Sequence, residues 1–148
     1  MVMHVKPENL RGAANICSDG GKHPLAAMFG ADETQRGGGL AIYCLFYNKE
    51  KRTMDTVKAE FPADGNLSYP CLTNLIPAAA WYERELHDMF GFVPEDHPDL
   101  RPLVLHESFP KGFHPLLKRF NPNFQVRGNR EYEMIAAYKK TAIVNPDL

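Results

Sequence analysis

Long apolar runs are missing from this 148-residue sequence. Its longest apolar stretches, 40–47 and 75–82, fall well short of the roughly 20 residues that a membrane-spanning helix requires. The N-terminus also lacks the apolar core of a secretory signal, because Val5 is followed at once by Lys6 and Pro7. We therefore expect a cytoplasmic chain that does not itself cross a membrane.

Ligand patterns for metals and nucleotides are also missing. The three cysteines, Cys17, Cys44 and Cys71, are too far apart to form the C-x-x-C pairs of zinc or iron–sulfur sites. The histidines show no H-x-x-x-H or H-E-x-x-H spacing. The glycines at 37–39 precede an apolar run instead of opening a helix, so they do not form a phosphate-binding loop. We expect this chain to bind no metal or other cofactor.

Charge of one sign is not in excess. Seventeen basic and eighteen acidic residues give a formal net charge of -1, which offers no general attraction for nucleic acid or for an anionic membrane. Hydrophobic residues make up 44% of the sequence and charged residues 24%, a balance that suits one globular domain. Any partner must therefore be recognised by a local surface.

The apolar pattern predicts an α+β protein with a mostly antiparallel sheet. The continuously apolar run at 40–47 is typical of a covered strand, and a short polar turn connects it to an alternating strand. Between 22 and 33 the pattern fits a strand or a short helix. The predicted elements are a helix at 7–17, the undecided segment at 22–33, strands at 40–47 and 52–61, a third antiparallel strand at 67–73, and a helix at 77–90.

The predicted helix at 77–90 is amphipathic and carries one carboxylate in an apolar position. At about 100° per residue, Glu85 projects between Trp81 and Met89, while Glu83 falls on the polar side. A carboxylate among apolar groups needs a partner if it is charged. Arg101 lies across the following turn, and its guanidinium suits a bidentate pair, so we predict an ion pair between Glu85 and Arg101.

Six prolines between 94 and 122 make a long helix implausible there. Such a segment is typical of a polypeptide that wraps a surface. We therefore divide the sequence into an α+β core domain at 1–93 and a proline-rich wrapping tail at 94–148, with a possible short helix at 131–138.

A catalytic role for the second helix is the alternative hypothesis. Glu85 and Asp88, together with His87, could supply a general acid and base, as in an independent small enzyme or a binding module. A solvated helix face and helix capping account for most carboxylates of this kind. The residues therefore favour a structural or interface role over catalysis.

The run from 81 to 101 closely resembles a family signature. The pattern W-Y-E-R-E-x-x-D-x-F-G, followed by H-P-D-L-R, is that of the thirty-kilodalton subunit of respiratory complex I, its C-type component. The resemblance covers roughly 7–120. It marks as signature or interface residues Trp81, Tyr82, Glu83, Arg84, Glu85, Asp88, Phe90, Gly91, His97, Pro98, Asp99, Leu100, Arg101, His114, Pro115 and Leu116.

This resemblance implies a non-catalytic subunit in the peripheral arm of a redox complex, without a cofactor of its own. Its expected partners are a large subunit, either the D-type component of complex I or a hydrogenase large subunit, and iron–sulfur subunits. These partners would hold the iron–sulfur clusters and the nickel–iron or quinone site. The resemblance also implies peripheral attachment, through the complex, to the cytoplasmic face of the inner membrane.

Two parent complexes stay open. A related domain occurs in membrane-bound [NiFe] hydrogenases of the formate hydrogenlyase type, and the segments 101–105 and 109–116 look more like that branch. Leu117 stands where complex I usually has arginine, and Arg119 where it usually has aspartate. The expected parent is therefore either a complex I-like NADH:quinone oxidoreductase or a related membrane-bound hydrogenase.

Overall fold

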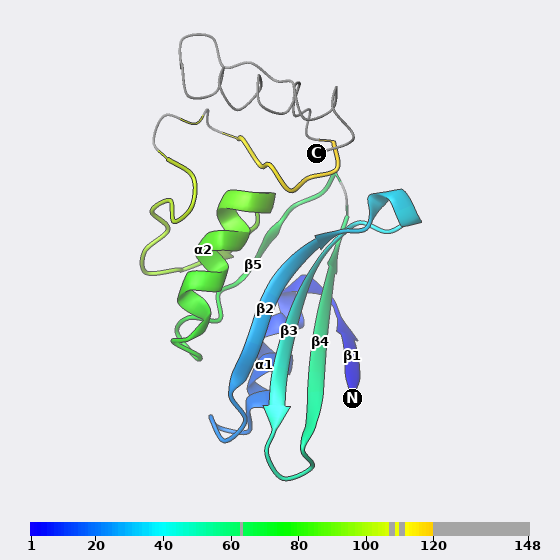
Figure 1. Ribbon diagram of the computed structural model, residues 1–148, viewed down its shortest axis with the longest axis vertical. Helices are drawn as coiled ribbons and strands as arrows, with labels where there is room; N and C mark the ends of the chain where they lie inside the picture. The colour runs from blue at the N-terminus through cyan, green and yellow to red at the C-terminus, as the bar shows by residue number, and fades with distance from the viewer. Residues whose placement is uncertain (63, 107–108, 110–111, 120–148) are drawn as a thin grey trace, which may run out of the picture.

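A four-stranded sheet forms the centre of the molecule (Figure 1). The structure, a computed structural model, describes residues 1–62, 64–106, 109 and 112–119. The strand order is β1-β4-β3-β2; β2–β3 and β3–β4 pair antiparallel, and β1 pairs parallel with β4. The strands are β1 (Val2–Val5), β2 (Leu25–Asp32), β3 (Leu40–Asn48) and β4 (Thr53–Phe61).

The predicted hairpin at 40–61 is confirmed, and the undecided segment at 22–33 is a strand. The sequence-based interpretation missed β1, which is short and lies at the sheet edge. An α+β fold with a mostly antiparallel sheet is therefore confirmed. The predicted short helix at 131–138 lies outside the described residues.

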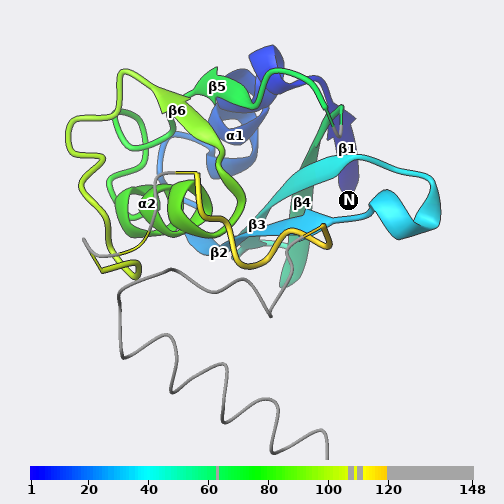
Figure 2. The same ribbon diagram turned by 90° about the horizontal axis from the view of Figure 1, so that it is seen from above.

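Two helices cover the same face of the sheet, as the view from above shows (Figure 2). Helix α1 (Leu10–Ser18) follows the 3-10 turn η1 (Pro7–Asn9) and contacts β3 and β4. Helix α2 (Ala79–Phe90) contacts β2. A second 3-10 turn, η2 (Thr34–Arg36), lies between β2 and β3. Both predicted helices are thus present.

A small second sheet corrects the prediction for 67–73. Only β5 (Ser68–Pro70) is a strand there, and it pairs parallel with β6 (Val93–Glu95) instead of extending the main sheet. Helix α2 connects the two strands, which is the kind of crossover that parallel pairing requires. A sequence pattern cannot reveal this, because the partner strand lies beyond the helix. Strand β6 spans the predicted boundary at 93/94.

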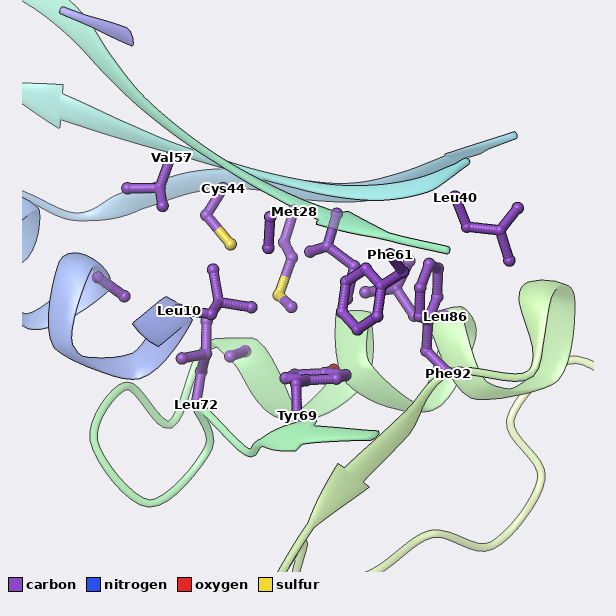
Figure 3. Packing of buried hydrophobic residues seen from close by; sticks show 14 of the residues in the cluster. Leu10, Met28, Leu40, Cys44, Val57, Phe61, Tyr69, Leu72, Leu86 and Phe92 are labelled. Atoms are coloured by element: carbon purple, nitrogen blue, oxygen red, sulfur yellow. The ribbon is translucent and has the colours of Figure 1, made fainter. Parts of the chain in front are cut away.

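The core lies between the main sheet and a layer made of α1, α2 and the small sheet (Figure 3). Alternate residues of β3, including Ile42, Cys44 and Phe46, point into it, as strand geometry dictates. Leu10 of α1 and Leu86 of α2 close it from the other side. Burial raises the pKa of the Cys44 thiol, so this cysteine behaves as a small apolar residue.

Two glycine-to-alanine substitutions should change stability in opposite directions. At Gly30 a Cβ would lie 2.8 Å from the Phe90 ring and 2.9 Å from Leu86, so Gly30→Ala should destabilise by about 1–3 kcal/mol. At Gly12 in α1 a Cβ would meet nothing within 4 Å, so Gly12→Ala should stabilise by about 0.5–1 kcal/mol. Urea unfolding measures both. Equal effects would contradict the close approach of α2 to β2.

Candidate functional site

The helix that carries the signature is rotated relative to the sequence-based prediction. Glu83 is fully buried, whereas Trp81 is 67% exposed and Glu85 is also exposed. The buried stripe runs through Ala79, Glu83, Leu86 and Phe90, which follow the i, i+4, i+7, i+11 spacing of one helix face. The prediction assigned the wrong face of the helix to the core, because it placed Trp81 on the buried face and Glu83 on the exposed face.

The Glu83 carboxylate connects α2 to the loop after β5. Its Oε1 accepts a hydrogen bond from the backbone N–H of Leu72 at 2.7 Å. Its Oε2 accepts two from Thr73, from the backbone N–H at 3.0 Å and from the hydroxyl at 2.5 Å. Burial of a carboxylate is costly unless such donors replace its hydration. Glu83 therefore fixes the loop by supplying the acceptors that two backbone groups require.

His97 and Tyr69 lie beside the same carboxylate. The His97 side chain is 1% exposed, and its Nε2 is 3.8 Å from Glu83 Oε2. His97 Nδ1 accepts the backbone N–H of Asp99 at 3.1 Å, and Nε2, although near Glu83, has no hydrogen-bond partner in the described residues. Burial, followed by the negative charge of Glu83, raises the pKa of Tyr69 well above its usual value. The Tyr69 hydroxyl has no partner at hydrogen-bonding geometry in the described residues.

Asp88 holds the segment that follows the second half of the signature. Its Oδ2 accepts backbone N–H bonds from Leu103, Val104 and Leu105, at 2.8, 2.8 and 3.2 Å. One turn earlier on α2, Arg84 donates to the carbonyl oxygens of residues 101 and 102, at 2.8 and 3.1 Å. Two side chains of one helix thus bind both the donors and the acceptors of an irregular backbone segment, which we call the clamped segment, 101–105.

His114 brings a more distant segment against the end of α2. Its Nδ1 lies 2.9 Å from the backbone oxygen of Asp88 and must donate, since a carbonyl only accepts. Gly91 ends the helix with φ 82°, and a Cβ there would lie 2.7 Å from His114 Nε2. The glycine of the signature is therefore needed both for the left-handed turn and for the approach of the imidazole ring.

The predicted ion pair between Glu85 and Arg101 is wrong. Arg101 forms a bidentate pair with Asp99 instead, at 2.9 and 2.7 Å. Hydrogen bonds from Arg101 hold the pKa of Asp99 well below its usual value, although the pair is largely exposed. Glu85 needs no buried partner, because the actual phase of α2 directs it to solvent.

The remaining signature residues range from buried to exposed. Phe90 is buried in the core, and Tyr82, Leu100 and Pro115 are partly buried; Pro98 and Leu116 are exposed. His87 donates from Nδ1 to the backbone oxygen of Phe92 at 2.8 Å.

Sequence reasoning missed Thr73 and Tyr69, because neither belongs to a recognisable motif. Among the described residues no group of three or more histidine, cysteine or acidic side chains could hold a metal ion.

Comparison with known proteins identifies the family of this chain. The model of the family "Respiratory-chain NADH dehydrogenase, 30 Kd subunit" matches residues 3–126. This chain belongs to that family. Within the described residues, no helix is long and apolar enough to span a membrane.

Relatives of this protein come from two kinds of complex. Hydrogenase-4 component G of Escherichia coli is 40% identical over 95 residues, 64% of this chain and 17% of that protein. The C subunit of NADH-quinone oxidoreductase from Phenylobacterium zucineum is 32% identical over 113 residues, 75% of this chain and 51% of that protein. The C/D subunit of NADH-quinone oxidoreductase from Shigella flexneri is 33% identical over 125 residues, 76% of this chain and 21% of that protein. The chain thus spans between a sixth and about half of these relatives.

A solved structure shares the fold of this protein. It belongs to the membrane-bound sulfane sulfur reductase, described as an archaeal respiratory membrane complex, and matches with a TM-score of 0.66. The match covers 95% of this chain and 75% of that chain at 23% identity. The likeness establishes the α+β architecture.

We predict that Glu83 and Glu85 differ sharply in their contribution to stability. Glu83→Ala leaves the buried N–H groups of Leu72 and Thr73 without an acceptor and should cost at least about 2 kcal/mol. Glu85→Ala, on the exposed side of the same helix, should change the free energy of unfolding by less than about 0.5 kcal/mol. Denaturant unfolding of both variants measures these effects. If Glu85 were the buried carboxylate, as the sequence pattern predicts, Glu85→Ala would be the more destabilising substitution.

Asp88→Asn should loosen the clamped segment without unfolding the protein. The amide of asparagine has one acceptor oxygen and no charge, so the N–H groups of Leu103, Val104 and Leu105 lose about 1–2 kcal/mol of local protection. Hydrogen exchange should accelerate about 5–30-fold at these amides. The amide of Val57 in the central strand β4 serves as the internal reference and should not change.

Proposed function

We propose that this chain is a non-catalytic subunit in the peripheral arm of a membrane-associated redox complex, of the complex I or membrane-bound hydrogenase type. Family membership and the names of the relatives support the parent assembly. The observation that carries the role is the way the signature residues are used. Glu83, Asp88 and Arg84 bind backbone groups of this chain, so these side chains fix the conformation of a surface.

The surface that they hold has the character of a docking site. Trp81 is 67% exposed, and the Arg84 guanidinium lies 5.9 Å from the centre of its ring. Val104 on the clamped segment is also exposed. An open depression of about 690 Å³ lies beside them, lined by Arg84 and residues 101–106. Exposed tryptophan and arginine on a rigid support are typical of the residues that dominate protein–protein binding. We call Trp81, Arg84, Pro102 and Val104 the signature surface.

The partners that fit this role are a large subunit and iron–sulfur subunits. The name of the C/D relative joins a C-type and a D-type portion, which supports a D-type or hydrogenase-type large subunit as the neighbour. In this proposal the neighbours carry the iron–sulfur clusters and the nickel–iron or quinone site. The protein itself attaches through them to the cytoplasmic face of the membrane.

Catalysis by the Glu85, His87 and Asp88 region gains no support from the geometry. Asp88 Oδ2 is bound by three backbone amides, and His87 donates to the backbone of Phe92. Glu85 is exposed on another side of the helix. A general acid and base must meet at a reacting group, whereas these side chains serve different parts of the backbone.

Trp81→Ala should impair assembly while leaving the fold intact. Because Trp81 is largely exposed, its loss should cost less than about 1 kcal/mol of stability. Loss of a central interface tryptophan costs about 2 kcal/mol or more in binding, so recovery of partners should fall about 30-fold. The control is Ile16→Ala, at a residue of similar exposure (69%) on α1.

The measurement uses the tagged full-length protein expressed in its native host and purified from solubilised membranes. Mass spectrometry then quantifies co-purified large and iron–sulfur subunits relative to the tagged protein. If the unmodified protein recovers no such subunit, the proposed function is wrong. If both variants retain their partners, the signature surface is not the docking site.

A further inference from the structure

Strand β2 is an edge strand of the main sheet in the part of the chain that the structure describes. It is last in the order β1-β4-β3-β2, so no further strand among the described residues pairs with its outer side. Residues 25–31 contain no charge and no proline, and from Ala27 onward the register is regular after one irregularity. Soluble proteins usually protect an edge with charge, proline or shortness. The opposite edge, β1, has only four residues, so it is protected by its length.

A cleft of about 370 Å³ opens where this edge begins. Pro24, Leu25, Leu75 and Ile76 supply apolar walls. His23 also lines it; this residue is 7% exposed, and its Nδ1 has no hydrogen-bond partner in the part of the protein that the structure describes. A buried polar atom usually has a partner. The cleft therefore combines apolar walls with a histidine nitrogen that has no partner among the described residues.

The open face of the sheet adds a third feature next to the edge. Phe29 of β2 is 46% exposed and stacks on Tyr43 of β3, with ring centres 5.1 Å apart. Alternation along the strands directs this pair away from the helices. An additional strand beside β2 would cover part of the exposed ring.

We propose that an extended segment of a partner subunit pairs with the free edge of β2 and inserts an apolar side chain into the cleft beside His23. In strand addition, main-chain hydrogen bonds provide affinity and pockets for individual side chains provide specificity. The side chain or its adjacent backbone supplies the group that bonds to His23 Nδ1. This inference rests on the proposed function only in taking the partner to be a subunit of the same complex.

A second copy of this protein fits the same edge less well. Two-fold pairing of β2 with its copy would be antiparallel, and this places the Gly30–Asp32 end of the copy beside Leu25. Glycine, alanine and aspartate offer no apolar side chain large enough for a cleft of about 370 Å³. A helix fits less well too, because its backbone groups are already paired internally and cannot bond to a row of strand N–H and C=O groups.

Hydrogen exchange on the full-length protein, alone and within the purified complex, tests the proposal. Alternate backbone amides of 25–29 should exchange rapidly in the isolated protein and about 100-fold or more slowly in the complex. Protection of all these amides in the isolated protein would overturn the proposal. If that protection depends on concentration, a second copy occupies the edge; if it does not, the protein itself covers it.

Two variants locate the contact. Ala26→Lys places a charge on the edge strand, and Ala78→Trp adds a large side chain to the lining of the cleft; each should reduce recovery of the paired subunit about tenfold or more. Thr53→Lys, at an exposed position of the interior strand β4, is the control and should have no effect. Thermal unfolding confirms that each variant folds. Normal recovery with both test variants, or an equal loss with the control, contradicts edge pairing.

These outcomes are distinct from those of the proposed function. If the unmodified protein recovers its partners and Ala26→Lys and Ala78→Trp do so too, only the strand pairing fails. If the unmodified protein recovers none, the proposed function fails regardless of β2.

Discussion

The buried carboxylate of Glu83 is the interaction on which the signature region depends. It lies fully buried on α2, where it accepts hydrogen bonds from Leu72 and Thr73 and faces the imidazole of His97. These contacts join the loop after β5, the helix and the segment after β6. Since an unpaired carboxylate would be strongly destabilising in such a place, all three segments must adopt their positions together. The helix then presents Arg84 and Asp88 at a defined angle to the clamped segment.

Two charged side chains of the signature, Arg84 and Asp88, bind the backbone of the clamped segment. Arg84 binds two carbonyl groups and Asp88 binds three amide groups, which replaces the pairing that a regular strand or helix would supply. The backbone from 101 to 105 is held without secondary structure and leaves Val104 exposed. Trp81 lies one turn from Arg84 on the same helix. A partly apolar surface held by side chains of α2 is the result, which agrees with the proposed role of a support subunit.

The two proposed contact regions are chemically different. The signature surface is built from side chains of α2 and of the clamped segment, whereas the edge of β2 offers backbone groups and a cleft near the start of α2. Helix α2 connects them, because its C-terminal half packs on β2 at Gly30 and its N-terminal end borders the cleft. A partner that bound at both places would hold α2 and the sheet as one unit.

Local patterns in the sequence determined the hairpin at 40–61, both helices, the α+β class and the family, because these depend on residues close together in the sequence or on a long motif. The period of 3.6 residues could predict that α2 is amphipathic but not its phase: a buried glutamate and an exposed tryptophan reverse the usual preference of both residue types. Only the tertiary structure decided that Glu83, not Glu85, is buried, that Arg101 pairs with Asp99, and that β5 pairs with β6 beyond the helix. The burial of Glu83 and the pairing of β5 depend on hydrogen-bonding groups from segments that are distant in the sequence. Arg101 pairs with Asp99 because the orientation of α2 directs Glu85 to solvent. Neither arrangement can be predicted from a local sequence pattern.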